Sequence, residues 1–195
     1  MSDLSFRLAS PEDASFLAGR VREVSHGVVD ALLLGLLPGI GPEQILSMVL
    51  RDTSSHFSHK NCVLACEENR PVGLLFAYPW QEQSIPGLMR TMIPKDRLSP
   101  LIDILTAVVP DSLYINTFWV AEDLRGQGLS DALMDYVKDW ARDTSLSKLS
   151  LFAWRDNSRA LAFYERHGFV RFRAVEVPEA FQEQNLQGDL YSCEL

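Results

Sequence analysis

The segment that most constrains this chain is an extended apolar run that leads through a glycine-rich turn into an amphipathic helix. Residues Leu113–Val120 are rich in β-branched and aromatic side chains, which predicts a central strand. The turn Arg125–Gly128 follows, and apolar residues then recur at helical spacing from Leu129 to Trp140. Such a turn points backbone N–H groups outward at the positive end of a helix dipole, which suits a phosphate group. Taken alone, the turn is better interpreted as a plain tight turn, because it is neither a Walker A loop nor a dinucleotide fingerprint.

A second motif follows the next predicted strand, residues 149–154. Asn157 precedes a short predicted helix over residues 158–167, where it would serve as an N-cap, and Gly168 stands where a left-handed C-cap is expected. One face of this helix carries Ala160, Phe163, Tyr164 and His167. For Ala160 and Phe163 this pattern is typical of core packing. Tyr164 differs, because a partly buried hydroxyl needs a partner and can deliver a proton.

The remaining segments predict a single α/β domain over residues 1–195 with one mixed sheet. The expected elements are a strand at 6–9, a helix at 14–24 after Ser10 and Pro11, interrupted helix over 25–59, a hairpin at 62–66 and 72–78, and extended segments at 169–177 and 190–195. Residues 79–110 contain five prolines and one apolar patch, 101–109, and are interpreted as an inserted loop plus a helix.

Composition limits the partners. The formal net charge of −8 disfavours nucleic acid and anionic membranes. Cys62 and Cys66 would lie too far apart on one strand to bridge, and no cysteine or histidine cluster has the spacing of a metal site, so we expect a reduced protein without metal. The first residues lack the pattern of a signal peptide, and the apolar stretch 31–40 is too short and too broken to span a bilayer. We therefore expect a cytoplasmic protein.

Together, the strand, the Arg-Gly-x-Gly turn, the helix, the next strand and the Asn-x-x-Ala-x-x-Phe-Tyr-x-x-x-Gly-Phe motif resemble the GCN5-related N-acetyltransferase (GNAT) family. The resemblance is strongest over residues 113–170 and absent from the insert at 79–110. It implies a central, mostly antiparallel mixed sheet flanked by helices, with a V-shaped cleft between the central strands. It also implies acetyl-CoA as co-substrate, without a metal.

The resemblance assigns roles to individual residues. The turn would hold the pyrophosphate of acetyl-CoA, the strand at Phe118–Val120 would pair with the pantetheine arm, and the Val120 N–H would polarise the thioester carbonyl. Tyr164 would protonate the departing thiolate, and Asn157 would contact the cofactor arm. The full set of residues expected at the cofactor is Phe118, Trp119, Val120, Arg125, Gly126, Gln127, Gly128, Leu129, Ser130, Asn157, Ala160, Phe163 and Tyr164.

Two departures from the family pattern bear on the chemistry. Glu122 stands where a proline is common, which brings it and Asp123 near the expected phosphate site and weakens the local field. The strand Leu113–Val120 contains no carboxylate or histidine to act as general base. Glu82, Asp111, His26 or an ordered water chain are the alternatives, and the sequence does not choose among them.

The predicted function is transfer of an acetyl group from acetyl-CoA to a primary amine of a small-molecule acceptor, by a monomer or homodimer. The acidic balance favours a cationic acceptor. The alternative is a CoA-binding regulatory module that has lost turnover. We expect the insert and the helical segment 25–59 to form the acceptor side of the cleft, although a surface elaboration or dimer contact fits them nearly as well. Trp80, Trp119 and Tyr78 are candidates for an apolar acceptor wall, whereas Phe76 is expected in the core.

Overall fold

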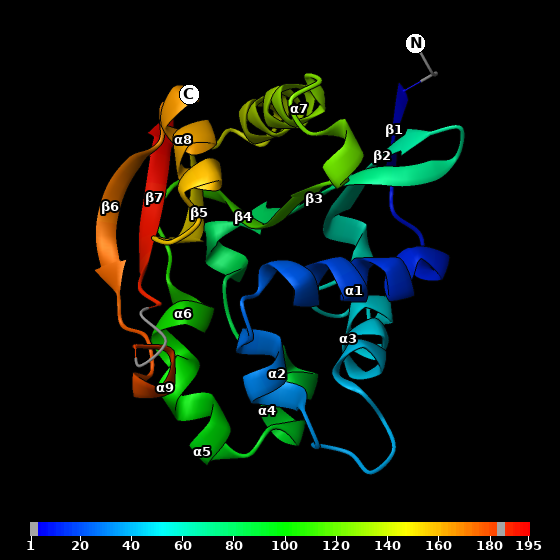
Figure 1. Cartoon of the computed structure of the whole chain (residues 1–195), viewed down its shortest axis with the longest axis vertical. Helices are drawn as coiled ribbons and strands as arrows, with labels where there is room; N and C mark the ends of the chain where they lie inside the picture. Colours follow the sequence, from blue (N-terminus) through cyan, green and yellow to red (C-terminus); the bar gives the residue numbers. More distant parts are fainter. Residues whose placement is uncertain (1–3, 183–185) are drawn as a thin grey trace.

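The computed structural model describes residues 4–182 and 186–195, and it contains one seven-stranded mixed sheet (Figure 1). The strand order is β1-β2-β3-β4-β5-β7-β6. The strands are β1 (Leu4–Leu8), β2 (Cys62–Glu67), β3 (Arg70–Pro79), β4 (Ser112–Val120), β5 (Lys148–Trp154), β6 (Val170–Val175) and β7 (Gly188–Glu194). All neighbouring strands are antiparallel except β4 and β5, which are parallel. This is the mixed, mostly antiparallel sheet that the family resemblance implies.

Helices cover both faces of the sheet (Figure 1). The α-helices are α1 (Ala14–Val24), α2 (Val28–Leu33), α3 (Pro42–Arg51), α4 (Gly87–Met92), α5 (Lys95–Leu98), α6 (Ile102–Thr106), α7 (Leu129–Asp143), α8 (Ser158–Arg166) and α9 (Glu179–Gln182). Two consecutive residues of β4 show which helix lies on which face, because neighbouring side chains of a strand point to opposite faces. Phe118 packs on Phe163 of α8, and Trp119 packs on Phe16 of α1. The helices α1 and α8 therefore lie on opposite sides of β4.

The insert at 79–110 differs from its prediction. The predicted helix at 101–109 is present as the shorter α6, and the part interpreted as loop contains α4, α5 and 3-10 turns. Its prolines explain the interruptions: Pro86 and Pro94 each directly precede a new helix, and Pro100 lies in the 3-10 turn before α6. Proline has no backbone N–H and disfavours helical conformation in the residue before it, so helices start next to these prolines instead of running through them. The insert still contributes buried side chains, among them Met89 and Ile104.

Other predicted elements are confirmed. Cys62 and Cys66 lie on β2, and both are buried free thiols, like Cys193. Gly168 ends α8 with a φ of 89°. Residues 31–40 form the end of α2 and a loop, and none of the helices in the described ranges combines the length and apolarity needed to cross a bilayer.

Candidate active site

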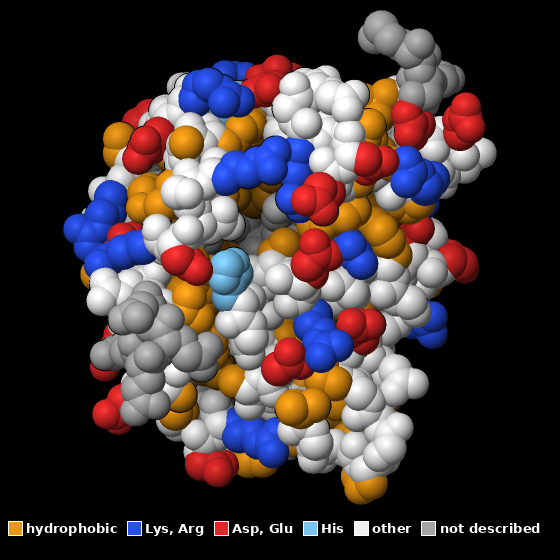
Figure 2. Space-filling view, viewed as in Figure 1, with side chains coloured by type: hydrophobic (Ala, Val, Ile, Leu, Met, Phe, Trp, Pro, Cys, Tyr) orange, Lys and Arg blue, Asp and Glu red, His pale blue; other side chains and the backbone are white. Residues whose placement is uncertain are grey.

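A cleft of about 570 Å³ opens where β4 and β5 separate. The two strands pair only from Ser112 to Ile115 on β4 and from Lys148 to Leu151 on β5. Beyond that point β4 continues along β3 and β5 continues along β7, so the two strands diverge. Figure 2 shows the hollow beside a histidine, with lysine and arginine side chains along one rim.

The diverging part of β4 presents an open backbone edge to the cleft. Val120 lies opposite Gly73 of β3, and the N–H of Ala121 donates to the carbonyl of Val72 at 2.9 Å. Because hydrogen-bonded and non-bonded pairs alternate in an antiparallel ladder, the N–H groups of Val120 and Phe118 point away from β3, toward the cleft. Arg125 Nε donates to the Val120 carbonyl at 3.1 Å. The edge can therefore pair with an extended ligand that carries amides.

The glycine turn lies at the start of α7. Gly126 and Gly128 have φ values of 78° and 90°, a conformation that favours glycine, and a Cβ built on either would meet no atom within 4 Å. The first backbone hydrogen bond of α7 is donated by the Ala132 N–H to the Gly128 carbonyl, at 3.0 Å. The earlier N–H groups thus have no partner within the helix, as at every helix N-terminus. The turn combines free donors with open space, which fits a phosphate group.

Three arginines line the cleft although the chain is acidic: Arg125, Arg159 and Arg166. The one aspartate on the same wall, Asp131, accepts hydrogen bonds from Arg166 at 3.0 Å and from His167 Nε2 at 2.8 Å. These bonds lower the pKa of Asp131. Glu122 and Asp123, which are predicted to weaken the field at the turn, have exposed side chains that do not line the cleft.

Tyr164 reaches the cleft from α8 and packs against Phe118 of β4 and Phe169. Burial raises its pKa to about 12, so the hydroxyl stays protonated at neutral pH. Within the described part of the chain, the hydroxyl has no hydrogen-bond partner. It is therefore available as a donor to a group bound in the cleft.

The structure brings most of the predicted cofactor residues to this cleft. Its walls include Phe118, Trp119, Val120, Arg125, Gly126, Gly128, Ser130, Asn157, Ala160, Phe163 and Tyr164. Two predicted residues turn their side chains elsewhere: Leu129 is buried near Gly73, and Gln127 donates to the carbonyl of Asp123 at 2.7 Å. Asn157 is the N-cap of α8, with its side chain accepting from the Ala160 N–H at 3.2 Å.

Only one of the three candidate bases lies at the cleft. His26 lines it, whereas Glu82 and Asp111 are exposed residues outside its walls. The backbone of His26 has a φ of 49°, which is uncommon for a residue with a side chain, and the following Gly27 has a φ of 89°. These two left-handed residues turn the chain between α1 and α2 and set the imidazole 5.7 Å from the Trp154 ring of β5. Strained backbone of this kind is often found at functional sites.

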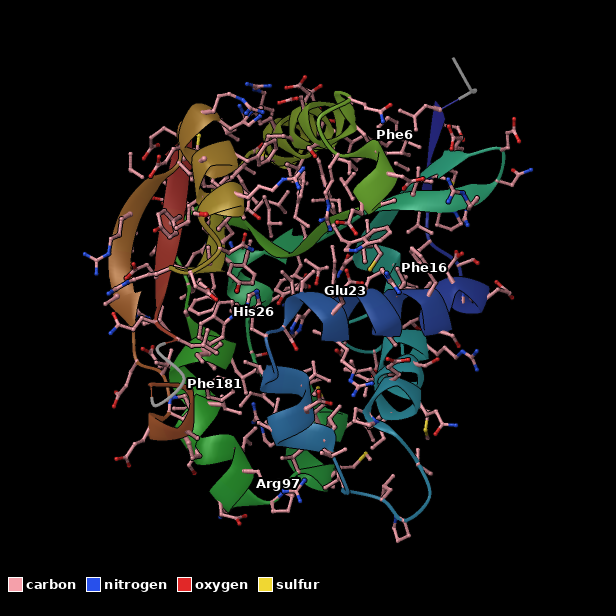
Figure 3. The ribbon with its side chains drawn as sticks, in the orientation of Figure 1. Phe6, Phe16, Glu23, His26, Arg97 and Phe181 are labelled. Atoms are coloured by element: carbon pink, nitrogen blue, oxygen red, sulfur yellow. The ribbon has the colours of Figure 1, made fainter. Side chains whose placement is uncertain are left out.

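Sequence reasoning missed Glu23, which also lines the cleft (Figure 3). Its carboxylate accepts from Trp119 Nε1 at 3.0 Å and pairs with Arg20 at 2.6 Å. The Arg20 guanidinium in turn stacks on the Trp119 ring. No local motif marks Glu23, since its position depends on α1 packing against β4. Both carboxylate oxygens of Glu23 are therefore already engaged by side chains of the protein.

A second, apolar cavity of about 160 Å³ adjoins the cleft. Its walls come from α1, α2, the insert and the sheet, and it shares four residues with the cleft: Val24, Asn116, Phe152 and Trp154. Of the aromatic residues predicted to form an acceptor wall, Tyr78 lines this cavity. Trp80 and Trp119 do not, and Phe76 is fully buried in the core as expected.

Comparison with known proteins gives matches in family and fold. A family model described as "Acetyltransferase (GNAT) family" matches residues 38–169. An N-acetyltransferase from Staphylococcus aureus Mu50 has 20% identity and a TM-score of 0.72, over 96% of this chain and 99% of that one. A structure described only as an acetyltransferase has 17% identity and a TM-score of 0.67, over 97% and 98%.

A third solved structure is that of the PaiA N-acetyltransferase from Thermoplasma acidophilum in complex with coenzyme A. It has 11% identity and a TM-score of 0.57, over 99% of both chains. No curated protein matches this chain.

Proposed function

Because the chain belongs to the GNAT acetyltransferase family, we propose that it transfers an acetyl group from acetyl-CoA to a primary amine of a small acceptor. The observation that carries the proposal is the open edge of β4, which faces a cleft that ends at the glycine turn of α7. The similar fold of a protein solved with coenzyme A supports the same placement. Acetyl-CoA supplies an activated thioester, and the chain's residues bind and orient it.

In this proposal the backbone does most of the cofactor binding. The free N–H groups at the start of α7 would hold the pyrophosphate, and Arg125, Arg159 and Arg166 would offset its negative charge. The N–H groups of Phe118 and Val120 would donate to the extended pantetheine arm. Of these two N–H groups, that of Phe118 lies farther from the glycine turn and nearer Asn116, where the cleft meets the apolar cavity, so it and not the predicted Val120 N–H would stabilise the oxyanion that forms during attack.

His26 would act as the general base. The acceptor amine is an ammonium ion in neutral solution, and its nitrogen must lose a proton before its lone pair can attack the thioester carbonyl. His26 is the candidate base that lines the cleft, and its ring lies near Trp154, a residue shared by the cleft and the apolar cavity. Attack forms the C–N bond, and the C–S bond then breaks to release the CoA thiolate.

Tyr164 would stabilise that thiolate. Its pKa of about 12 lies above the ~8.5 of an ordinary thiol, so complete transfer of its proton to the thiolate is unfavourable. A hydrogen bond from the hydroxyl to the developing thiolate avoids this cost. We therefore assign Tyr164 to hydrogen bonding of the leaving group, with the final proton coming from solvent.

The alternative of a CoA-binding regulatory module depends on the lack of a base on β4. His26 provides a candidate base from another element, so the main support for that alternative is weakened.

The proposal is tested by melting the protein with CoA and by assaying acetyl transfer. CoA at about 100 times its Kd should add roughly 2.7 kcal/mol to the free energy of unfolding and raise the Tm. Thiol release from acetyl-CoA should depend on an added amine. No Tm shift at millimolar CoA would contradict the cofactor assignment. A Tm shift without transfer to any amine would favour the regulatory module.

A further inference from the structure

The walls of the apolar cavity carry no charge. Every lining residue within the described part of the chain is neutral, with aliphatic side chains from α1, α2 and the insert and aromatic ones from the sheet. An ammonium group placed inside would therefore lose its water without gaining a carboxylate partner. Such burial of an unpaired charge is strongly unfavourable.

Three of the polar side chains in the cavity, those of Tyr78, Gln83 and Asn116, form a hydrogen-bonded chain. Tyr78 accepts from Asn116 Nδ2 at 3.1 Å and donates to Gln83 Oε1 at 2.7 Å. Gln83 Nε2 donates to the carbonyl of Leu105 at 3.1 Å. This chain of hydrogen bonds links the sheet to the insert. Because these polar groups already have partners, they gain little from a polar ligand. The cavity thus selects for an apolar occupant.

The volume limits the size of that occupant. Engineered apolar cavities of about 150 Å³ bind benzene. The cavity here is close to this size, at about 160 Å³. It can hold one aromatic ring or an alkyl group of similar bulk.

We propose that the acceptor is a primary amine that carries one benzene-sized apolar group and no second charge. This inference rests on the proposed acetyltransferase function. The apolar group occupies the cavity, and the amine lies at the shared residues Asn116, Phe152 and Trp154, beside His26. The proposal departs from the expectation based on net charge, because the acidic residues of the chain do not line this cavity.

An isosteric pair of amines provides the first test. Pentylamine and 1,4-diaminobutane have the same length, and the second ends in an ammonium group instead of a methyl group. With saturating acetyl-CoA, 2-phenylethylamine and pentylamine should both be acetylated, and kcat/KM for 1,4-diaminobutane should be at least ~100-fold below that for pentylamine. Equal or better use of the diamine would overturn the proposal.

The Tm shift with CoA, measured on the same protein, separates failure of the acceptor proposal from failure of the proposed acetyltransferase function. A normal shift with no transfer to either apolar amine overturns the acceptor class and leaves the cofactor assignment standing. Loss of both the shift and all transfer rejects the proposed function, and the acceptor class with it.

A matched pair of variants tests the location. Met89→Glu places a carboxylate on the cavity wall, whereas Leu88→Glu places one on the exposed side of the same helix. Met89→Glu should lower kcat/KM for 2-phenylethylamine at least ~10-fold and preserve the CoA-induced Tm shift, and Leu88→Glu should change neither. Unchanged kcat/KM in a folded Met89→Glu protein would show that the acceptor binds elsewhere. If that variant does not fold, the isosteric amines decide the question on the unaltered chain.

Discussion

The cofactor side and the acceptor side of the site present different kinds of groups to their ligands. On the cofactor side, β4, α7 and α8 offer mainly backbone: an open strand edge, free N–H groups and two glycines with positive φ. On the acceptor side, α1, α2 and the insert offer side chains that meet from distant parts of the sequence. Backbone features of this kind come from short, contiguous motifs, whereas the apolar cavity has no motif. The shared chemistry can thus remain constant while the acceptor side varies.

His26 lies at the junction of the two sides, and its replacement should have the largest effect. His26→Gln removes the proposed base and should lower kcat/KM for the amine by about 10²- to 10⁴-fold at neutral pH. The loss should diminish as pH rises, because more of the amine is then deprotonated in solution. A pH profile of kcat/KM measures this. Glu82→Gln and Asp111→Asn serve as controls, and an effect in either of them instead of His26→Gln would reassign the base.

Gly128→Val tests the backbone character of the cofactor side. Valine is strained at a φ of 90°, and its branched side chain would fill the space in front of the α7 N–H groups. The Kd for CoA, measured by calorimetry, should rise about 100-fold or more. Gly39→Val is a matched control, since Gly39 has a φ of 73° and open space but lies in the loop between α2 and α3. If both variants weaken CoA equally, general destabilisation and not the phosphate site explains the loss.

Tyr164→Phe should have an intermediate effect. A hydrogen bond to a charged group contributes about 1.5–3 kcal/mol, so kcat should fall about 10- to 150-fold. The Kd for CoA should change little, because the bond forms mainly as the thiolate leaves. Tyr136→Phe removes a hydroxyl from an exposed tyrosine of α7 and should leave kcat unchanged. An unaltered kcat in Tyr164→Phe would assign Tyr164 to packing alone.

Gln83→Leu should have the smallest effect and should act on the acceptor side only. It removes the acceptor of the Tyr78 hydroxyl and the bond to Leu105, which loosens the link between the sheet and the insert. We expect KM for the amine to rise roughly 3- to 10-fold, in line with the ~1 kcal/mol of a typical hydrogen bond. The Kd for CoA should stay constant, as it should in the exposed control Gln81→Leu. A change in CoA affinity would show that the two sides are not independent.

The same contrast explains what could be predicted from sequence. Strands and helices with strong local patterns, such as Leu113–Val120 and the helix after Gly128, follow directly from residue spacing. The divergence of β4 from β5 is a tertiary feature, and no residue pattern within either strand encodes it. It was expected only through family resemblance.

The insert and the junction were harder to predict. The sequence predicts a loop and one helix for the insert, whereas α4 and α5 lie in the part interpreted as loop, each directly after a proline. The sequence leaves His26 as one of three candidate side chains for the general base. Nothing in the residues around a break between two helices indicates which strand a histidine there will face. Glu23 was missed for the same reason, since only the packing of α1 on β4 brings it to Trp119.

The central claim is that the open backbone edge of β4 binds acetyl-CoA, and amide hydrogen exchange measured by NMR tests it most directly. Alternation along β4 directs the N–H groups of Phe118 and Val120 to the cleft and that of Trp119 to β3. Without ligand, the amides of Phe118 and Val120 should exchange much faster than that of Trp119. Saturating CoA should protect Phe118 and Val120 and leave Trp119 nearly unchanged. Equal protection of all three amides before CoA is added, or no gain at Phe118 and Val120 afterwards, would contradict the account.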